Sequence, residues 1–229
     1  MKAQTSSSYV DKLHPSSSHM LIVHWLESYP PGTRILDVGT ASGTIGRICK
    51  DKQFFLSGIE PDRSYAELAL PFYMEWINTD LDHAPDEKIS NYQVVICADV
   101  LEHIPSPEKS LQRLVDLQAG PTEFIISVPN IANVWVRINL LIGRFDYSER
   151  GILDRTHLRF FTRTTFLRML QEAGLDLVEI RVTPIPLDLV HPFFCRNSVG
   201  ILLYKILTWL TRMFPTLLGY QWISLSRTR

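Results

Sequence analysis

Short apolar runs alternate with helical segments along most of this chain, and this order constrains the fold more than any other feature of the sequence. The alternation is typical of βαβ units, in which helices cover both faces of a mostly parallel sheet. We therefore expect an α/β protein that binds its ligands at the carboxyl ends of the strands. Strands are predicted at 34–38, 54–60, 75–79, 93–98, 123–128, 177–182 and 221–226. Helices are predicted at 17–27, 43–50, 62–70, 131–142 and 162–173, and one opens at Ser106 and Pro107.

Length, charge and cysteine content narrow the class of protein. The 229 residues favour one domain over residues 1–229. A net charge of −1 lacks the basic character of a general nucleic-acid binder, so no nucleic-acid partner is expected. Cys49, Cys97 and Cys195 stand far apart, which argues against a disulfide framework and a structural zinc site. The polar start of the chain lacks a secretory-signal pattern, so a cytoplasmic location is expected.

The segment 34–46 is the most informative in the chain. A predicted strand ends around Asp37, and Gly39, Ala41 and Gly43 then form a tight turn into a helix. Small residues let the backbone approach a ligand closely, and the start of the helix offers free N–H groups. Such a turn can also be a plain connection between strand and helix, so it indicates a site only together with other residues.

Four carboxylates stand at the ends of four successive predicted strands, namely Asp37, Glu60, Asp80 and Asp99. Glu60 stands at the distance along the chain, about 20 residues, at which a carboxylate can take the hydroxyls of a ribose. Asp80 is placed to accept a hydrogen bond from an adenine amino group. Each acid alone fits a solvated loop, but the four together predict a nucleoside pocket.

Asp37 also discriminates between cofactors. A dinucleotide site holds a pyrophosphate, which a carboxylate at the end of the first strand would repel. S-adenosylmethionine (SAM) has an ammonium and a sulfonium and no phosphate, so SAM is the expected cofactor and S-adenosylhomocysteine (SAH) its product. An NAD-dependent dehydrogenase is the alternative, opposed by Asp37 and by the lack of a Tyr-x-x-x-Lys pair.

These motifs resemble those of class I SAM-dependent methyltransferases. Residues 37–43, Asp-Val-Gly-Thr-Ala-Ser-Gly, are similar to the first motif of the family, and residues 95–104 to the fourth. The resemblance implies a Rossmann-like, seven-stranded, mostly parallel sheet with an antiparallel last strand. It also implies that the cofactor contacts Asp37, Gly39, Ala41, Gly43, Glu60, Asp80, Leu81 and Asp99. Ala41 stands where the family usually has glycine, so the loop geometry is expected to differ there.

Residues 127–133, 143–147 and 151–162 are similar to a bacterial subgroup related to ubiquinone-biosynthesis-type methyltransferases. This kinship implies methyl transfer to a hydroxyl of a glycan, lipid-linked or secondary-metabolite acceptor. N- or C-methylation, and a non-catalytic SAM-binding subunit, stay open as alternatives. In this reading residues 1–30 hold an N-terminal helix, 131–162 form a lid insertion, and 190–219 form an apolar helical insertion before the last strand.

Two histidines are candidates for the base that an alcohol acceptor requires. His157 lies in the predicted lid, and Asp154, three residues earlier, is placed to orient its ring. His103 follows the fourth strand, near the methyl group in this fold. The alternatives are that Asp154 and His157 only pin the lid and that His103 only packs.

The predicted lid also offers side chains for binding the acceptor, namely Arg155, Arg159 and Tyr147. The arginines could recognise a phosphate or carboxylate on the acceptor. Alternatively, the lid arginines pair with nearby acids, namely Asp146, Glu149 and Asp154. No metal is expected, because Asp80 is assigned to adenine and no second His/carboxylate pair has helical ligand spacing.

Residues 199–218 form a strongly apolar stretch. The polar and charged positions that fall on one helical stripe are Tyr204, Lys205, Thr208, Thr211 and Arg212. The broad apolar arc that remains has to be covered by something. The two cations argue against a membrane span, which leaves packing against the protein's own sheet or lid, a homodimer, or peripheral contact with the inner face of a membrane. Together with 131–142 and 192–194, the stretch could line an apolar acceptor pocket.

Overall fold

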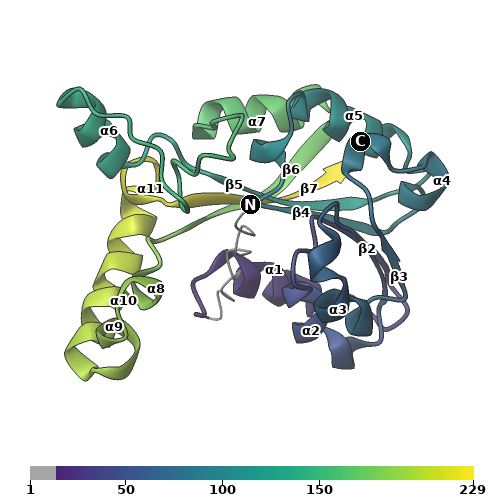
Figure 1. Ribbon diagram of the computed structural model, residues 1–229, viewed down its shortest axis with the longest axis horizontal. Coiled ribbons are helices and arrows are strands. Elements are labelled where there is room, and N and C mark those ends of the chain that lie inside the picture. Colours follow the sequence, from purple (N-terminus) through teal and green to yellow (C-terminus); the bar gives the residue numbers. More distant parts are fainter. Residues whose placement is uncertain (1–13) are drawn as a thin grey trace, which may run out of the picture.

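Seven strands form the sheet of the computed structural model, which describes residues 14–229 (Figure 1). They are β1 (Arg34–Val38), β2 (Phe55–Ile59), β3 (Glu75–Ile77), β4 (Val94–Ala98), β5 (Glu123–Pro129), β6 (Leu175–Thr183) and β7 (Gln221–Thr228). The spatial order is β3-β2-β1-β4-β5-β7-β6. Neighbours among β1–β5 pair in parallel, and β7 is antiparallel to both β5 and β6. The predicted fold class is therefore confirmed, including the antiparallel last strand.

The strand order reverses direction between β1 and β4. From β1 the chain proceeds outward through β2 to β3, and it then returns to place β4 on the other side of β1. In open α/β sheets the crevice outside the carboxyl ends of two such strands is where ligands bind. The loops that follow β1 and β4 therefore meet at the expected site.

Helices cover both faces of the sheet (Figure 1). One face carries α1 (Ser18–Leu26), α2 (Thr44–Ile48) and α3 (Ala66–Ala69), and the other carries α4 (Asp86–Ile89), α5 (Pro107–Asp116) and α7 (Arg163–Glu172). Successive strand residues point to opposite faces. Ile35 accordingly packs in the hydrophobic cluster with α1 and α2, whereas Leu36 packs in the cluster with α5 and α7.

Several helices differ from their predicted bounds. The helix predicted at 62–70 is broken into α3 with a 3-10 turn on either side, the second of which, Leu70–Phe72, contains Pro71. The helix predicted at 131–142 is α6 (Val134–Leu141), which begins late because the Asn133 side chain caps it by accepting from the Trp135 N–H. Ser106 stands at the N-cap of α5 as predicted, but its side chain makes no capping hydrogen bond. Thr162 forms a capping box at the start of α7.

Between β6 and β7 the chain forms four helices at one end of the sheet (Figure 1). They are α8 (Leu187–Val190), α9 (Phe193–Arg196), α10 (Ser198–Met213) and α11 (Pro215–Leu218). Tyr204 and Thr211 of the polar stripe are buried, while most of the apolar side chains of α10 are exposed. Of the three alternatives left open for this stretch, packing of its apolar arc against the protein's own sheet or lid does not agree with this exposure. Within the described part of the chain, no helix combines the length and hydropathy needed to cross a membrane.

The Tyr73 ring lies in a space left open by three glycines. A Cβ atom built at Gly43, Gly46 or Gly58 would come within 3.3 Å of this ring. Tyr73 is almost fully buried and belongs to the cluster beneath α1 and α2. These three glycines therefore serve packing, and Gly43 also gives the turn after β1 its positive φ.

We predict that Gly46→Ala lowers the free energy of unfolding by about 1–3 kcal/mol, the usual effect of overpacking. A new Cβ would lie 2.9 Å from both the Tyr73 ring and the Phe72 Cβ atom. At an unconstrained helical position, replacing glycine by alanine would raise the free energy of unfolding by up to about 1 kcal/mol. A decrease therefore indicates that the new Cβ atom clashes with its neighbours. Urea unfolding measures it. Gly120→Ala is the control, because a Cβ there meets nothing within 4 Å; an unchanged or raised stability of Gly46→Ala contradicts the packing argument.

Candidate active site

A cavity of about 580 Å³ lies at the carboxyl ends of β1 and β4. The four acids predicted from the strand ends all line it: Asp37, Glu60, Asp80 and Asp99. Gly39, Ala41 and Leu81 line it as well, whereas Gly43 lies below the loop, against Ala69 and Tyr73. Seven of the eight residues expected to contact the cofactor therefore line this cavity, and the eighth, Gly43, packs beneath it.

The Glu60 carboxylate connects the loop after β1 to the turn after β2. Glu60 accepts hydrogen bonds from the backbone N–H of Ala41 at 2.8 Å and of Asp62 at 2.9 Å. Ala41 has a φ of +43°, a conformation that glycine adopts more easily. Burial raises the pKa of Glu60, and the two backbone hydrogen bonds oppose that rise. A single acid therefore shapes the loop and presents negative charge to the cavity.

Asp37 is buried at the floor of the cavity. The Tyr73 hydroxyl donates to its Oδ2 atom at 2.5 Å. Burial raises the pKa of Asp37 to about 7, the Tyr73 hydrogen bond counteracts the rise, and the charge of Glu60 adds to it. A buried carboxylate with so high a pKa is poised to gain a cationic partner, because a positive charge nearby favours its ionised form.

Asp80 and Leu81 form the side of the cavity beyond β3. Asp80 caps a 3-10 turn by accepting from the backbone N–H of His83 at 3.0 Å, and its Oδ1 lies 2.7 Å from Nδ1 of that histidine. Leu81 is buried and presents an apolar surface next to it. An exposed carboxylate beside an aliphatic wall suits the polar edge and the flat face of a nucleobase.

A second cavity of about 290 Å³ adjoins the first. Asp99 and His103 line both cavities, so these two side chains stand at their junction. The Asp99 carboxylate accepts from the Ser127 hydroxyl on β5 and from the Gln221 amide on β7, each at 2.7 Å. Its φ of +57° is unusual for a residue other than glycine. The two strands therefore fix this carboxylate between the two cavities.

His157 lines the second cavity from the predicted lid. Its Nδ1 lies 3.1 Å from the Ile152 carbonyl oxygen. Because a carbonyl can only accept, Nδ1 carries the proton and Nε2 keeps a free lone pair. Burial lowers the pKa of His157, so the ring is neutral at neutral pH. Contrary to the prediction, the Asp154 carboxylate does not hydrogen-bond to the His157 ring but accepts from the N–H and the hydroxyl of Thr156.

Asp154 acts on the other histidine, through Thr156. The Thr156 hydroxyl donates to Asp154 Oδ1 at 2.6 Å, and its oxygen lies 3.1 Å from Nδ1 of His103. The Thr156 carbonyl oxygen is 3.2 Å from the same nitrogen. Both oxygens can accept from a protonated Nδ1, which leaves Nε2 of His103 as the basic nitrogen. The Asp-x-Thr stretch thus orients His103, not His157.

The two imidazole rings lie close together. Their centroids are 4.8 Å apart in an edge-on arrangement, and the buried Glu102 carboxylate completes a cluster whose potential ligand atoms lie within 4.8 Å of one another. Both Nδ1 atoms are already engaged by Thr156 and Ile152, so the Nε2 atoms are the ones left to meet a bound group.

The three predicted acceptor-binding residues lie elsewhere. Arg155 pairs with Glu149 at 2.7 Å, as the alternative interpretation predicted, and Arg159 donates to the Pro105 carbonyl. Tyr147 is exposed and stacks edge-on against Phe145. None of the three lines either cavity. The described residues that line the second cavity also include none from α6, from 192–194 or from α10, so the predicted apolar pocket is absent there.

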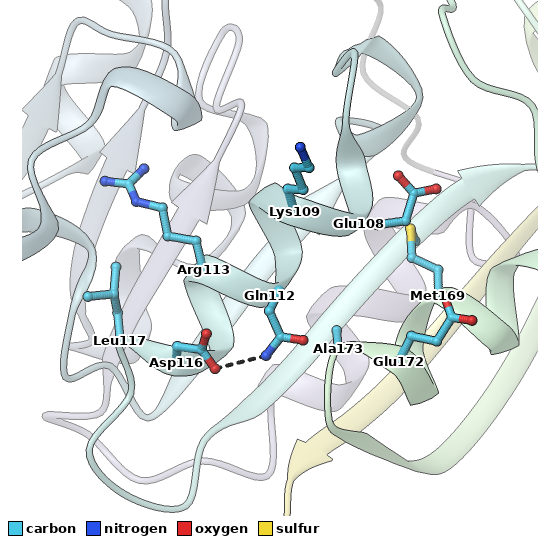
Figure 2. Close-up of a pocket in the computed structure, with 9 residues that line it drawn as sticks. All are labelled: Glu108, Lys109, Gln112, Arg113, Asp116, Leu117, Met169, Glu172 and Ala173. Atoms are coloured by element: carbon cyan, nitrogen blue, oxygen red, sulfur yellow. Dashed lines mark hydrogen bonds between the residues drawn. The ribbon is translucent and has the colours of Figure 1, made fainter.

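A groove between α5 and α7 is a poor candidate for the site (Figure 2). It lies on the helical layer, away from the strand ends. The guanidinium of Arg113 is directed away from it to the carbonyl oxygens of Leu81 and Ala84, and Gln112 donates to Asp116 across one turn of α5. The remaining side chains carry no converging set of groups for a ligand.

Sequence reasoning missed several residues around the two cavities. His19 on α1 and Tyr65 line the first cavity, and Arg150, Tyr220 and Gln221 line the second. No motif marks them, because distant segments bring them in. Thr156 was detectable in principle, since it stands between the two lid residues that were predicted.

Comparison with known proteins agrees with this geometry. A family model described as a methyltransferase domain matches residues 18–180. The ubiquinone biosynthesis O-methyltransferase of Burkholderia pseudomallei is 25% identical over 167 residues, which cover 69% of this chain and 71% of that protein.

Solved structures agree on the fold. A SAM-dependent methyltransferase from Archaeoglobus fulgidus has a TM-score of 0.61 at 15% identity and covers 92% of both chains. The magnesium protoporphyrin IX methyltransferase of Synechocystis with bound SAH has a TM-score of 0.64 at 14% identity and covers 93% of this chain and 82% of that one. The family model and these structures show that the cofactor is SAM, which excludes the NAD-dependent dehydrogenase. The chain belongs to the methyltransferase-domain family and is a class I SAM-dependent methyltransferase.

Proposed function

We propose that this methyltransferase transfers the methyl group of SAM to a hydroxyl of an acceptor held in the 290 Å³ cavity. The observation that carries the proposal is the junction formed by Asp99 and His103, which line both cavities. A methyl group on one side and an acceptor on the other would meet there. In-line transfer requires such an arrangement of two adjoining spaces.

The first cavity is proposed to hold SAM with one acid for each polar part. Asp37 faces the ammonium, Glu60 the ribose hydroxyls, and Asp80 the adenine edge, with Leu81 against the base. The sulfonium then lies toward Asp99. Burial favours this assignment for Asp37, because its raised pKa makes it responsive to a cation.

His103 is proposed to take the proton of the acceptor hydroxyl. Its Nδ1 is oriented by Thr156, and its Nε2 is the free basic nitrogen at the junction. As the oxygen attacks the methyl carbon, the carbon–sulfur bond breaks, SAH leaves as a neutral thioether, and the hydroxyl proton passes to the imidazole. His157, with a neutral ring on the acceptor side, is proposed to position the acceptor.

An oxygen acceptor is preferred because of the relatives. The curated relatives are named ubiquinone biosynthesis O-methyltransferases, and a base at the junction is needed most for an alcohol. The acceptor class is proposed to be a hydroxylated small molecule, glycan or lipid-linked compound. Transfer of tritiated methyl from SAM to phenolic, saccharide and polyprenyl-linked hydroxyl acceptors tests it. Methylation of amines alone, or of none of these while SAH still binds, contradicts the proposal.

We predict that SAH binds about tenfold more weakly at pH 6 than at pH 8. The ammonium of SAH favours ionised Asp37, whose pKa is about 7 in the free protein. Below that pH, binding must first remove a proton, so affinity falls; above it, affinity is constant. Calorimetric titration in buffers of different ionisation enthalpy measures both the affinity and the released proton.

Substitutions of Asp37 and Tyr73, at the floor of the cavity, test whether SAH binding is linked to the loss of a proton from Asp37. Asp37→Asn should bind weakly at every pH and release no proton, and Tyr73→Phe should shift the decline to higher pH because it removes the hydrogen bond that stabilises the carboxylate. Asp51→Asn, an exposed change, is the control. An affinity of the unaltered protein that stays constant over this pH range rules out Asp37 as the partner of the ammonium.

We predict that His103→Ala slows single-turnover methyl transfer by about 10²–10⁴-fold and leaves SAH affinity within about twofold, as expected for loss of a general base. His157→Ala should raise the KM for the acceptor more than it lowers kcat. His24→Ala, an exposed histidine on α1, is the control. A larger loss of kcat in His157→Ala than in His103→Ala would exchange the two roles.

A further inference from the structure

Helix α10 turns its polar side inward and its apolar side outward. Tyr204, only 3% exposed, donates from its hydroxyl to Asp188, and Thr211 is fully buried. On the opposite side Leu202 is 57% exposed and Trp209 is 60% exposed. A water-exposed helix normally has the reverse pattern. The outer apolar surface is defined here as the seven apolar side chains of 199–214 that are at least 45% exposed, namely Val199, Leu202, Leu203, Ile206, Trp209, Met213 and Phe214.

Helix α6 also exposes apolar side chains at the same end of the molecule (Figure 1). It buries only Val136 among its residues, and Trp135 is 65% exposed. The side-chain amides of Asn130 and Asn133 both donate to the carbonyl of Gly219, directly after α11. These hydrogen bonds tie the start of α6 to the end of the α10–α11 pair. Both exposed apolar helices therefore belong to one rigid end of the protein.

The charges around these helices have one sign. The sequence has no Asp or Glu in 130–145 or in 189–229. The cations in and beside the two helices are Arg137, Arg144, Arg196, Lys205 and Arg212. Within the portion of the chain that the structure describes, none of these five has a carboxylate partner in a salt bridge. An exposed apolar surface with tryptophan and unpaired cations fits the interface of an anionic bilayer.

We propose that α6 and α10 dock this methyltransferase on the surface of a membrane that contains anionic lipids. The apolar side chains enter the boundary between headgroups and acyl chains, and the cations contact lipid phosphates. A second copy of the chain fits less well, because a two-fold dimer would place the same cations opposite one another without acids to neutralise them. Leu189 of α8 and Tyr220, two residues after α11, line the second cavity, so docking would bring that cavity close to the bilayer.

Co-sedimentation of the full chain with vesicles tests the proposal. The chain should bind vesicles of equimolar phosphatidylcholine and phosphatidylglycerol, and bind pure phosphatidylcholine vesicles much more weakly. The double variant L202E/W209E should lose at least about tenfold in vesicle affinity, and Trp135→Glu should weaken binding independently. Lys205→Gln should weaken it roughly fivefold at low salt, the equivalent of about 1 kcal/mol for one cation near an anionic surface. High salt should reduce that difference.

Leu68→Glu is the matched control, because Leu68 is 58% exposed on α3, away from the outer apolar surface. SAH affinity and thermal melting of each variant show that the fold and the cofactor site are intact, so failure of docking and failure of methyl transfer are separable. Equal binding of L202E/W209E and the unaltered chain overturns the proposal. So does a stable dimer in light scattering that L202E/W209E dissociates while vesicles fail to bind.

Discussion

The hydrogen bond from Tyr73 to Asp37 is the interaction on which this structure depends most. A carboxylate buried this deeply is tolerated only with a polar partner, and the Tyr73 hydroxyl supplies it. The ring reaches that position because Gly43, Gly46 and Gly58 leave room for it. Gly43 also ends the turn after β1, where it adopts a positive φ. Packing under the loop and the charge in the cofactor cavity are therefore consequences of one arrangement.

The local sequence pattern was sufficient to predict the strands of the sheet and most of the acids and small residues that line the 580 Å³ cavity. Parallel strands that are buried on both faces are short apolar runs, and their carboxyl ends meet at one edge, so Asp37, Glu60, Asp80 and Asp99 could be placed together before any coordinates. Helix ends were less accurate. The helix predicted at 62–70 begins as a 3-10 turn and becomes α-helical only at Ala66, and Asn133 moves the start of α6 by capping it.

The acceptor side was harder to predict, because its residues come together only through tertiary contacts. Asp154 is three residues from His157, and sequence distance alone suggested that pair; the backbone turn instead directs Thr156 between Asp154 and His103. Arg155 and Arg159 satisfy neighbouring groups of the protein rather than a ligand. The direction in which α10 turns its polar stripe likewise depends on Asp188, a partner that no periodicity identifies.

The register of the last two strands has a consequence for how such enzymes diversify. Thr183, the final residue of β6, pairs with Gln221, the first of β7, so the segment 184–220 leaves and re-enters the sheet at adjacent positions. Among the described residues, those that line the cofactor cavity include none from this segment. A segment with closely spaced ends can be lengthened, shortened or exchanged at little cost to the remainder. Changes in this segment can therefore alter the lining of the second cavity while the 580 Å³ cavity keeps its lining residues.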